Sequence, residues 1–403
     1  MTHAAQAQST SPQGSWPTDR GGRAGRPRGP EDRRRGRGAI PEPARPPDDA
    51  PDGRPERTAP EESGWDSQEA ADVLERARRT VDPELRRAVD RLPEAMRRIA
   101  RYHFGWEHAD GTPAAGNAGK AVRPALVLAA VEALRGRPET AVRAAAAVEL
   151  THNFTLLHDD LMDRDRTRRH RATAWTVFGE ADAILAGDAL QAQAQLLLAQ
   201  DGHPAATSAA ARLAACVVEL CEGQHTDTAL ERRSLDAVNL DECLGMAEAK
   251  TGSLLGCACA LGALYAGADD EVVDALDEFG RAAGLAFQLI DDVIGIWGDP
   301  VRTGKPAGAD LMARKKSLPV VAALTSDSPS GARLAELYAR PPEESDLERT
   351  VAALEGAGGR DWAQIQAADH MARAVHHLSR AVPDPQAAGG LLSLAEFVTR
   401  RTV

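Results

Sequence analysis

The sequence predicts an all-α fold, a single large helical bundle around a central cavity. From about residue 66 onward the chain is rich in Ala, Leu and Val, and its apolar residues recur at helical spacing. The strict alternation that marks β-strands is nearly absent. Small residues are frequent in the apolar runs, as in GSLLGCACALGAL (252–264), which lets neighbouring helices approach closely. Together these observations favour helices that pack against one another rather than against a sheet.

Helical periodicity accounts for most of the chain after residue 66. The expected helices cover 67–81, 83–104, 122–136, 139–163, 172–200, 205–223, 237–265, 270–297, 317–324, 345–356, 360–380 and 386–401. Gly, Pro and Asn interrupt the pattern over 105–119, which is expected to be a loop. No repeat of fixed period is visible, so we expect one helical domain over residues 66–403.

Residues 1–65 differ in composition and are expected to form a disordered tail. They hold almost no aliphatic side chains, and their eleven arginines against ten acidic residues leave a net charge near +1. Such a segment cannot bury enough apolar surface to offset the entropy lost on ordering it. Its basic run, residues 20–38, is best explained as a solvated tail, next as a segment that docks to a partner, and last as an RNA contact.

Charge and cysteine usage exclude several classes of protein. The whole chain carries −12, so the body after the tail is acidic, which argues against general nucleic-acid binding. No apolar run reaches the roughly 18 residues of a transmembrane segment, and no secretory pattern follows the N-terminus. The five cysteines lack zinc-like spacing and are expected to be small core residues in a reducing compartment. We therefore expect a cytoplasmic protein.

Carboxylates crowd the end of an otherwise apolar helix, THNFTLLHDDLMD (151–163). Asp159 and Asp163 are four residues apart, so on a helix they share one face about 6 Å apart, with Asp160 beside them. Carboxylates in such proximity repel one another unless a cation lies between them, and oxygen ligands without cysteine suit Mg²⁺. Taken alone, the spacing is more typical of a solvated acidic helix end.

A second acidic cluster strengthens the metal interpretation. The run FQLIDDVIGIWGD (287–299) is again apolar and helical, and it carries Asp291 and Asp292 near its end. If the two clusters face each other across a bundle, they can hold several Mg²⁺ ions with water and substrate phosphates completing the coordination.

Basic residues surround both clusters, as a site for an oligophosphate requires. Arg168 and Arg169 follow the first cluster, and Lys120 and Arg123 precede its helix. The Gly/Pro-interrupted basic segment 304–317 follows the second cluster and is typical of a lid that grips phosphate. Its lysines at 315 and 316 are equally explained as a solvated helix start. Acids for Mg²⁺ beside bases for phosphate, on an apolar bundle, indicate an apolar substrate with a charged head.

In order along the chain, these motifs resemble those of the trans-type isoprenyl diphosphate synthases, the polyprenyl synthetase family. The resemblance covers about residues 70–400 and consists of GKAVRP (119–124), HDDLMDRDRTRR (158–169), GQHTD (223–227), KTGSLLG (250–256), FQLIDD (287–292) and GDPVRTGKPAGADL (298–311). It implies the isoprenoid synthase bundle, a homodimer, and Mg²⁺-dependent condensation of isopentenyl diphosphate with an allylic diphosphate. The product would be a short all-trans prenyl diphosphate, C20 or else C15, formed by ionisation, 1′-4 alkylation and proton loss.

The resemblance also implies roles for individual residues. About three Mg²⁺ ions would be held mainly by Asp159, Asp163 and Asp291, with support from Asp160 and Asp292. The departing allylic diphosphate would be neutralised by Arg168, Lys250 and Lys305. Isopentenyl diphosphate would be held by Lys120, Arg123, His152 and Arg169. The developing allylic cation would lie near Thr251 and Gln288, and the product tunnel would have a partial floor at Phe154 and Thr155.

The sequence departs from the family pattern at three points. Ala121 stands where an arginine is frequent, and Gly295 stands where the second cluster usually has its last aspartate. The segment HRATAW (170–175) replaces a small residue and a proline, which leaves the shape of that loop open. Because the principal carboxylates remain, we expect an active enzyme.

Other functions remain open at this stage. A catalytically silent subunit of the same family would share the fold, and a class I terpene cyclase would share the acidic cluster and Mg²⁺. His158 next to Asp159 could also belong to the dyad of a metal phosphohydrolase, although such enzymes need further histidine ligands. Ordinary family members begin near residue 70 of this chain. We therefore expect residues 1–65 to dock the enzyme to a protein partner, such as a shell that encloses it as cargo.

Overall fold

A computed structural model describes residues 64–114, 119–300 and 306–399 of the chain. Contacts divide the chain into residues 1–59 and 60–403, and all described residues lie in the second unit. The predicted tail, residues 1–65, lies almost entirely outside the described residues, and so do residues 301–305, which include Lys305 of the predicted lid.

The predicted all-α class is confirmed. The described residues fold into α1 (Gly64–Asp90), α2 (Glu94–His103), α3 (Val122–Ala133), α4 (Val142–Met162), α5 (Ala174–Phe178), α6 (Glu180–Ala199), α7 (Ala206–Arg232), α8 (Leu240–Ala247), α9 (Ser253–Tyr265), α10 (Asp270–Trp297), α12 (Ala309–Met312), α13 (Leu318–Leu324), α14 (Pro329–Tyr338), α15 (Leu347–Gly356), α16 (Gly359–Ala381) and α17 (Pro385–Thr399). Short 3₁₀ turns stand at η1 (Pro138–Ala141), η2 (Leu235–Ala237) and η4 (Glu344–Asp346), and a π-helical turn, η3, at Glu248–Gly252. Within the described ranges the strands are β1 (Thr167–Arg168) and β2 (Arg171–Ala172), which form one antiparallel hairpin.

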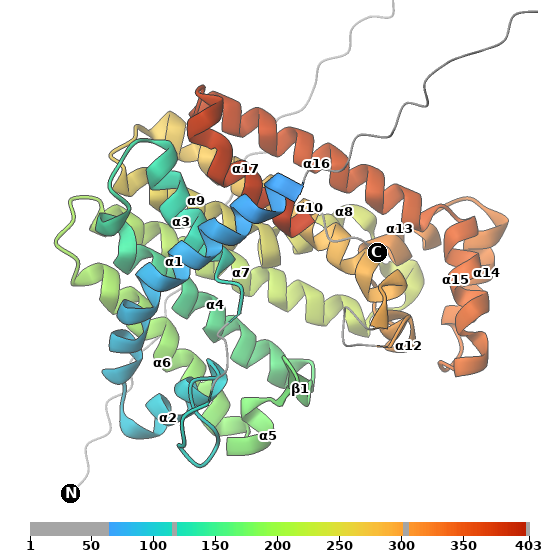
Figure 1. Cartoon of the computed structure of the whole chain (residues 1–403). Helices are drawn as coiled ribbons and strands as arrows, with labels where there is room; N and C mark the ends of the chain where they lie inside the picture. The colour runs from blue at the N-terminus through green and yellow to red at the C-terminus, as the bar shows by residue number, and fades with distance from the viewer. Residues whose placement is uncertain (1–63, 115–118, 301–305, 400–403) are drawn as a thin grey trace, which may run out of the picture. The chain divides into compact units, whose positions relative to one another are not determined.

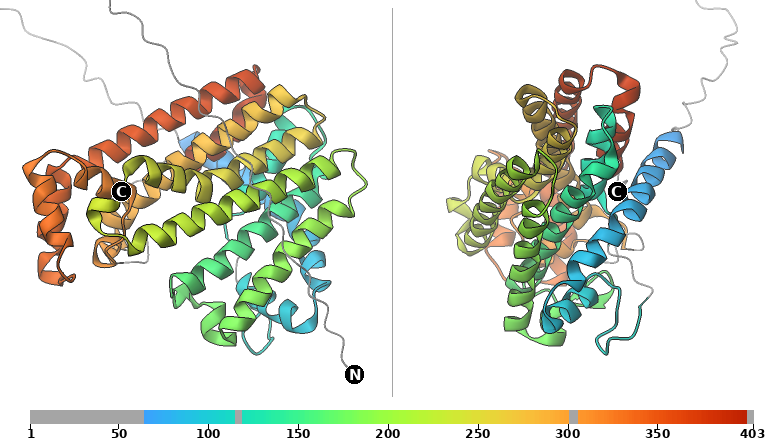
Figure 2. Two further views of the ribbon diagram at one scale, coloured as in Figure 1. Left: turned by 180° about the vertical axis from the view of Figure 1, so that it is seen from behind. Right: turned by 90° about the vertical axis from the view of Figure 1, so that its left-hand side faces the viewer.

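Helix α10 is the central element of the bundle. It packs along α16 on one side and α9 on the other, while α4 packs along α6 and α3 along α9 (Figures 1 and 2). The small residues predicted to allow close approach do so. A Cβ added to Gly280 of α10 would lie 2.5 Å from the carbonyl oxygen of Leu255 and 2.6 Å from Cα of Gly256, both in α9. Nearly every residue of α9 is buried as a result.

Several predicted boundaries are wrong for identifiable reasons. The helices predicted at 67–81 and 83–104 are broken at the wrong place, because α1 runs through Pro83 and ends at Asp90. Proline inside a helix costs about 3 kcal/mol, but Val81, Leu85 and Ala88 are buried on both sides of it and hold the helix together.

The region predicted as one helix over 172–200 is also interrupted. Gly179 has a φ of 101°, which separates α5 from α6, and residue 172 belongs to the hairpin. The predicted helix 237–265 is divided by η3, and α14 was not predicted at all. None of the described helices is long and apolar enough to span a membrane.

Candidate active site

The first acidic cluster closes the C-terminal end of α4. Residues of α4 before the cluster are mostly buried, and the amide of Asp163 donates to the carbonyl of Asp159 at 2.8 Å, so both carboxylates stay within one helical turn. Asp160 points inward and is 2% exposed. Its Oδ1 accepts a hydrogen bond from Nε of Arg168 at 2.7 Å, while its Oδ2 is buried without a hydrogen-bond partner among the described residues. Asp160 is therefore engaged inside the protein, and Asp159 and Asp163 are the carboxylates left to meet a ligand.

A lysine from η3 faces this cluster. Nζ of Lys250 lies 2.5 Å from Oδ2 of Asp227, which α7 contributes. Burial lowers the pKa of Lys250, but the charges of Asp159, Asp227 and Asp163 outweigh it and raise the pKa, so the ammonium stays charged. A π-helical turn is an uncommon element that recurs at functional sites. Here it presents Lys250 to carboxylates from two other helices.

The electrostatics of α4 favour a bound cation. Burial raises the pKa of Asp159 to about 6, and the neighbouring Asp163 adds to the shift against the opposing charge of Lys250. Burial likewise raises the pKa of Asp163. Carboxylates held in this way are costly to ionise until positive charge arrives.

The two carboxylates of the second cluster have different surroundings. Asp291 is exposed, whereas Asp292 is 3% exposed. Protein donors already surround Asp292, because its Oδ1 accepts from Nε2 of Gln288 at 2.9 Å and its Oδ2 from the amide of Leu318 at 2.9 Å. The arrangement fits Asp291 as the ligand of this pair and Asp292 as its support.

A hydrogen-bond chain links this cluster to η3. Oγ1 of Thr251 donates to Oε1 of Gln288 at 2.9 Å, and Gln288 donates in turn to Asp292. The two side chains predicted near an allylic cation are therefore together and fixed in orientation.

The segment after the undescribed part of the lid brings Lys315 to the site, and Lys315 and Lys316 both have protein partners, so their interpretation as a solvated helix start is wrong. Nζ of Lys315 lies 3.7 Å from Oδ1 of Asp292 and 3.8 Å from Oδ2 of Asp310. Burial opposes its charge, but Asp292, Asp310, Asp291 and Asp227 raise the pKa of Lys315 well above its usual value.

The next residue points to another helix. Nζ of Lys316 donates to the carbonyl oxygens of Leu230, Glu231 and Arg233 at the C-terminal end of α7. The carbonyl of Leu230 also accepts from the amide of Arg233 at 3.2 Å, and Lys316 adds a positively charged donor to this end of α7.

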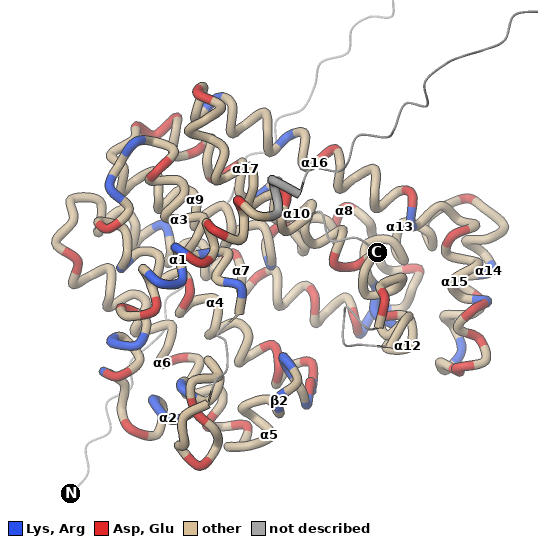
Figure 3. The backbone as a smooth tube through the Cα atoms, in the orientation of Figure 1, with Lys and Arg blue, Asp and Glu red and all other residues tan. Residues whose placement is uncertain are grey.

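The two acidic clusters share their cations. The charge of Lys315 lowers the pKa of Asp163 on α4, and Asp292 on α10 raises the pKa of Lys315. Red and blue segments adjoin both at the hairpin after α4 and around α12 (Figure 3). Among the described residues, no three His, Cys, Asp or Glu side chains form a ready-made metal cage. This fits Mg²⁺, which takes one or two carboxylates and completes its shell with water and substrate phosphates.

The residues predicted to hold isopentenyl diphosphate lie beside α3 and α4. Nη1 of Arg123 lies 3.2 Å from Nε2 of His152. Because arginine can only donate, Nε2 of His152 must accept, and the ring is neutral with its proton on Nδ1. Burial, with the nearby charges of Arg123 and Arg169, holds the pKa of His152 well below its usual value. His152 therefore orients Arg123 and does not donate from Nε2 to a ligand.

Lys120 and Arg169 approach the same region from two loops. Nζ of Lys120 lies 5.0 Å from the ring centroid of Phe397 in α17. The guanidinium of Arg169 lies against Gly119, where an added Cβ would be 2.6 Å from Nη2, and the φ of 115° at this position favours glycine.

The segment whose shape the sequence left open, residues 170–175, runs from the turn of the β-hairpin through β2 to the start of α5. Arg169 and His170 both have left-handed backbone, with φ of 51° and 61°. Arg171 then donates to the carbonyls of Tyr102 and Glu107, each at 2.9 Å, and fixes the hairpin to the end of α2.

The predicted tunnel floor lies on α4 beneath the acids. The ring of Phe154 meets His158 edge-on, with centroids 4.8 Å apart, and Thr155 is buried. His158 donates from Nε2 to the carbonyl of Ile184 at 3.0 Å, and its ring packs against Gly187 of α6. His158 is thus tied to α6, which does not support the phosphohydrolase dyad.

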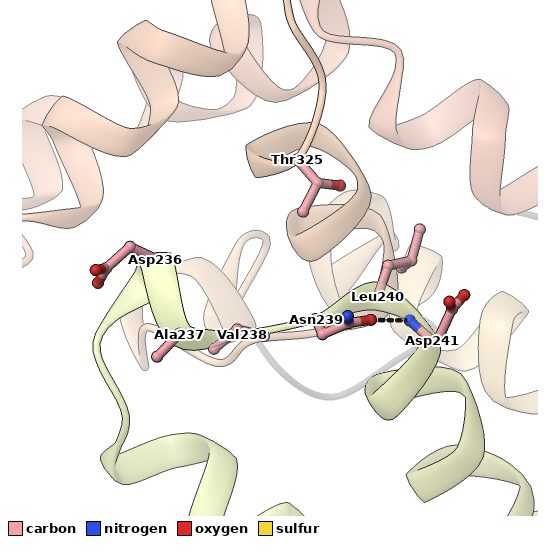
Figure 4. Close-up of a pocket in the computed structure, with 7 residues that line it drawn as sticks. All are labelled: Asp236, Ala237, Val238, Asn239, Leu240, Asp241 and Thr325. Atoms are coloured by element: carbon pink, nitrogen blue, oxygen red, sulfur yellow. Dashed lines mark hydrogen bonds between the residues drawn. The ribbon is translucent and has the colours of Figure 1, made fainter. Parts of the chain in front are cut away.

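A shallow hollow elsewhere on the surface is not part of the candidate active site. It is lined by residues 236–241 and Thr325 (Figure 4), and none of the predicted site residues borders it. Oδ1 of Asn239 accepts from the amide of Asp241 and caps α8, so the polar side chain there serves the helix end.

The structure brings charged residues to the candidate site that were not among the predicted site residues. Asp227, Lys315 and Asp310 join the charged centre, and Glu149 is buried beside Arg123 with a pKa raised by burial to about 7. The motif GQHTD contained the signal for Asp227, since it ends in a carboxylate at the end of an apolar helix.

An all-helical bundle with two acidic clusters and lysines between them is suited to a substrate with a diphosphate head. Residues 112–354 match the polyprenyl synthetase family. A geranylgeranyl diphosphate synthase of Mycobacterium tuberculosis is 48% identical over 332 residues, which make up 82% of this chain and 93% of that protein. A (2E,6E)-farnesyl diphosphate synthase of the same organism is 43% identical over 335 residues, 82% of this chain and 92% of that protein.

The fold is similar to that of a solved relative. The crystal structure of a polyprenyl synthetase from Streptomyces coelicolor A3(2) matches with a TM-score of 0.78 and 45% identity, covering 82% of this chain and 99% of that one. The chain belongs to the polyprenyl synthetase family, a family of prenyltransferases.

Proposed function

We propose that the protein is a Mg²⁺-dependent short-chain prenyltransferase that joins isopentenyl diphosphate to an allylic diphosphate. The observation that carries the proposal is the convergence of Lys250 and Lys315 between the carboxylates of α4, α7 and α10. Acids alone would bind a metal, and lysines alone would bind an anion. Their alternation within one apolar bundle suits a metal-bound diphosphate whose hydrocarbon chain enters the core.

The residues divide the reaction between them. Mg²⁺ held by Asp159, Asp163 and Asp291 would supply the positive charge that makes diphosphate a leaving group. Lys250 and Lys315 would hold that diphosphate as the allylic C–O bond breaks. The double bond of isopentenyl diphosphate then forms the new C–C bond with the allylic carbon, and a proton is lost, which the departed diphosphate can accept.

The polar chain Thr251–Gln288 faces this centre with an oriented dipole. Gln288 donates its amide protons to Asp292, so its carbonyl oxygen is available to Thr251 and to a neighbouring positive charge. Arg123, oriented by His152, together with Lys120 and Arg169 would bind the second diphosphate.

We infer a C20 product. Phe154 is an aromatic floor on α4, but the buried Thr155 beside it is small and leaves the floor partial. The geranylgeranyl diphosphate synthase relative is also more similar to this chain than the farnesyl diphosphate synthase relative. A C15 product is the alternative.

The direct test combines labelled isopentenyl diphosphate with C5, C10 or C15 allylic partners and Mg²⁺. Label in a longer diphosphate, with C20 dominant, supports the proposal. A hydrocarbon formed from one substrate would instead identify a terpene cyclase, and no turnover with any partner would identify a silent subunit. The Asp159→Ala variant should bind Mg²⁺ and diphosphate more weakly in titration calorimetry, and full activity in this variant would refute the metal assignment.

We further propose a homodimer formed through the outer faces of α6 and α7. Ile184, Leu185 and Leu196 of α6 are exposed, and Val218 of α7 is 70% exposed. The two helices pack side by side, and we propose that these side chains contribute to one interface. Such surfaces on soluble proteins are typical of association sites.

For residues 1–65 we retain docking to a protein shell or scaffold in the cytoplasm as a proposal. It is supported by composition alone, an arginine-rich segment ahead of an acidic catalytic body. A chain that begins at residue 66 should keep full prenyltransferase activity and lose any co-purifying assembly. If both forms purify alone and behave identically, the docking proposal is wrong.

A further inference from the structure

Two glycines bring neighbouring helices into direct contact with η3, the π-turn that carries Lys250. A Cβ added to Gly223 of α7 would lie 2.6 Å from the amide nitrogen of Lys250. A Cβ added to Gly284 of α10 would lie 2.8 Å from Cα of Gly252 and 3.5 Å from the carbonyl oxygen of Thr251. The backbones of α7 and α10 therefore both lie against the backbone of the π-turn.

On α7, carboxylates stand one turn before and one turn after this glycine. Glu219, Gly223 and Asp227 are spaced four residues apart, so they lie along one face of the helix. Asp227 pairs with Nζ of Lys250 in η3. Glu219 pairs with α10 instead, because its two carboxylate oxygens accept from Nη1 and Nη2 of Arg281 at 2.6 and 2.8 Å.

The guanidinium of Arg281 connects α10, on which it stands, with both α7 and η3. Its Nε donates to Oδ2 of Asp277 at 2.6 Å, and its Nη1 lies 4.0 Å from Oε1 of Glu248, the first residue of η3. Its stem passes over Gly256, where an added Cβ would lie 2.8 Å from Cγ of Arg281. Bidentate arginine–carboxylate pairs are strong and directional. Arg281 and Glu219 therefore fasten α7 to α10 beside the π-turn.

We propose that Arg281 and Glu219 are positioning residues for Lys250, because their ion pair holds η3 in its π conformation. A π-turn is wider than an α-helical turn and rarely persists without support. If η3 relaxed to an α-helix, the register would shift by one residue, a rotation of about 100°, and would turn Lys250 away from Asp227. The inference rests on the proposed function in one respect, that Lys250 meets the allylic diphosphate.

A second arginine joins the same two helices and provides a matched control. Nη2 of Arg212 on α7 donates to Asp274 on α10 at 3.0 Å, and its Nη1 donates to Asp277 at 3.3 Å. Arg212 stands two turns before Glu219, about 10 Å along α7. Loss of either arginine removes an ion pair between α7 and α10, but only Arg281 contacts the first residue of η3.

The first experiment compares the steady-state kinetics of Arg281→Met and Arg212→Met. We expect kcat to fall by about tenfold in Arg281→Met, with KM for isopentenyl diphosphate unchanged. Arg212→Met should change kcat by about twofold at most. Glu219→Leu, which removes the other partner of the pair, should reproduce Arg281→Met. Arg281→Lys keeps the charge but cannot engage both carboxylate oxygens in the same way, so its kcat should be intermediate.

A Lys250→Met background tests whether Arg281 acts through Lys250. There the side chain to be positioned is gone, so adding Arg281→Met should lower the residual kcat by about twofold or less. A tenfold loss in both backgrounds would overturn the proposal, because Arg281 would then affect the reaction by another route. Equal losses of kcat in Arg281→Met and Arg212→Met would overturn it as well.

The second experiment, amide hydrogen exchange, needs neither substrate nor metal. Amides of residues 250–254 should exchange about tenfold faster in Arg281→Met than in the natural chain, and should be unchanged in Arg212→Met. Arg281→Lys gives the same comparison with a smaller increase if Arg281→Met does not fold. Unchanged exchange in the folded Arg281 variant would overturn the proposal. A natural chain that is inactive with every allylic partner would refute the proposed function instead, and the exchange measurement would still test the support of η3.

Discussion

At the scale of single residues, the most informative group is a carboxyl that the fold makes costly to ionise. Asp159 is held near Asp163 in a largely buried setting, and burial raises its pKa to about 6. A carboxyl whose pKa is raised in the folded state binds its proton more tightly there than in the unfolded chain. Stability is therefore lost as the pH rises from about 4 to about 6. This loss of stability falls on a carboxylate that the proposed metal site needs in its charged form.

Asp159→Asn should therefore stabilise the metal-free protein, and only at high pH. At pH 7.5 in EDTA we expect a gain of about 2 kcal/mol in the free energy of unfolding, since two pKa units correspond to just under 3 kcal/mol. At pH 4 the gain should fall to a small fraction of this value, because the carboxyl is protonated in the folded state and only about half ionised in the unfolded chain. Urea denaturation at the two pH values measures this. A gain of equal size at both would show that ionisation is not its cause.

Phe154 belongs to the same helix and should control product length. Phe154→Ala removes the ring that packs on His158 and deepens the space beneath Asp159. We expect most of the product to be longer by at least one C5 unit, measured by mass spectrometry of the diphosphates. Thr155→Ala, one residue further along α4, removes much less volume and is the matched control. An unchanged product from folded Phe154→Ala protein would place the floor elsewhere.

At the scale of elements, the sequence predicted helices well where apolar spacing alone decides them. The predicted 270–297 matches α10 residue for residue, because its acidic N-cap Asp269 and the glycine after Trp297 mark both ends. The predicted helix break at Pro83 was wrong. Local propensity favours a break there, but the packing of Val81 and Leu85, which holds α1 together, depends on partners distant in sequence. The β-hairpin was missed because two residues per strand leave no alternation to detect.

The adjacent lysines of the lid segment should differ in what is lost when each is replaced by methionine, mainly stability for Lys316 and mainly activity for Lys315. Lys316 caps the carbonyl end of α7, so Lys316→Met should lower the free energy of unfolding by about 1–3 kcal/mol. Lys315 faces the carboxylates of the charged centre, so Lys315→Met should lower kcat by about 10²-fold or more. Lys315→Met should also cost some stability, because Asp292 and Asp310 lose a compensating charge, so the loss of kcat is what distinguishes it from Lys316→Met. Urea denaturation and steady-state kinetics on both variants separate the two roles.

Lys316→Arg provides the control for capping, since it keeps the charge and should recover part of the stability. Amide exchange over residues 229–233 should speed up in Lys316→Met and not in Lys315→Met. If both variants lose stability and activity to the same extent, the assignment of one lysine to each helix is wrong.

At the scale of the whole molecule, the order of motifs predicted which residues gather, while only the fold decides how they pair. Asp159, Asp163, Lys250 and Gln288 were predicted together, and the packing of α4 against α6 and of α10 against α9 brings them together. The pairings of Asp160 with Arg168 and of His152 with Arg123 were not predictable. Each side chain could have met a ligand, and the choice depends on burial that no spacing reveals.

The last prediction concerns the outer surface of α6 and α7, whose exposed apolar side chains are proposed to form the dimer interface. We expect the protein to have twice the mass of one chain in sedimentation equilibrium. Leu185→Arg places a charge in this surface and should shift the mass toward the monomer at micromolar concentration, since burying an unpaired charge is strongly unfavourable. Ile365→Arg changes a side chain on α16 that is exposed to a similar extent, and it should leave the mass unchanged. A dimer that survives Leu185→Arg and is lost in Ile365→Arg would move the interface to α16.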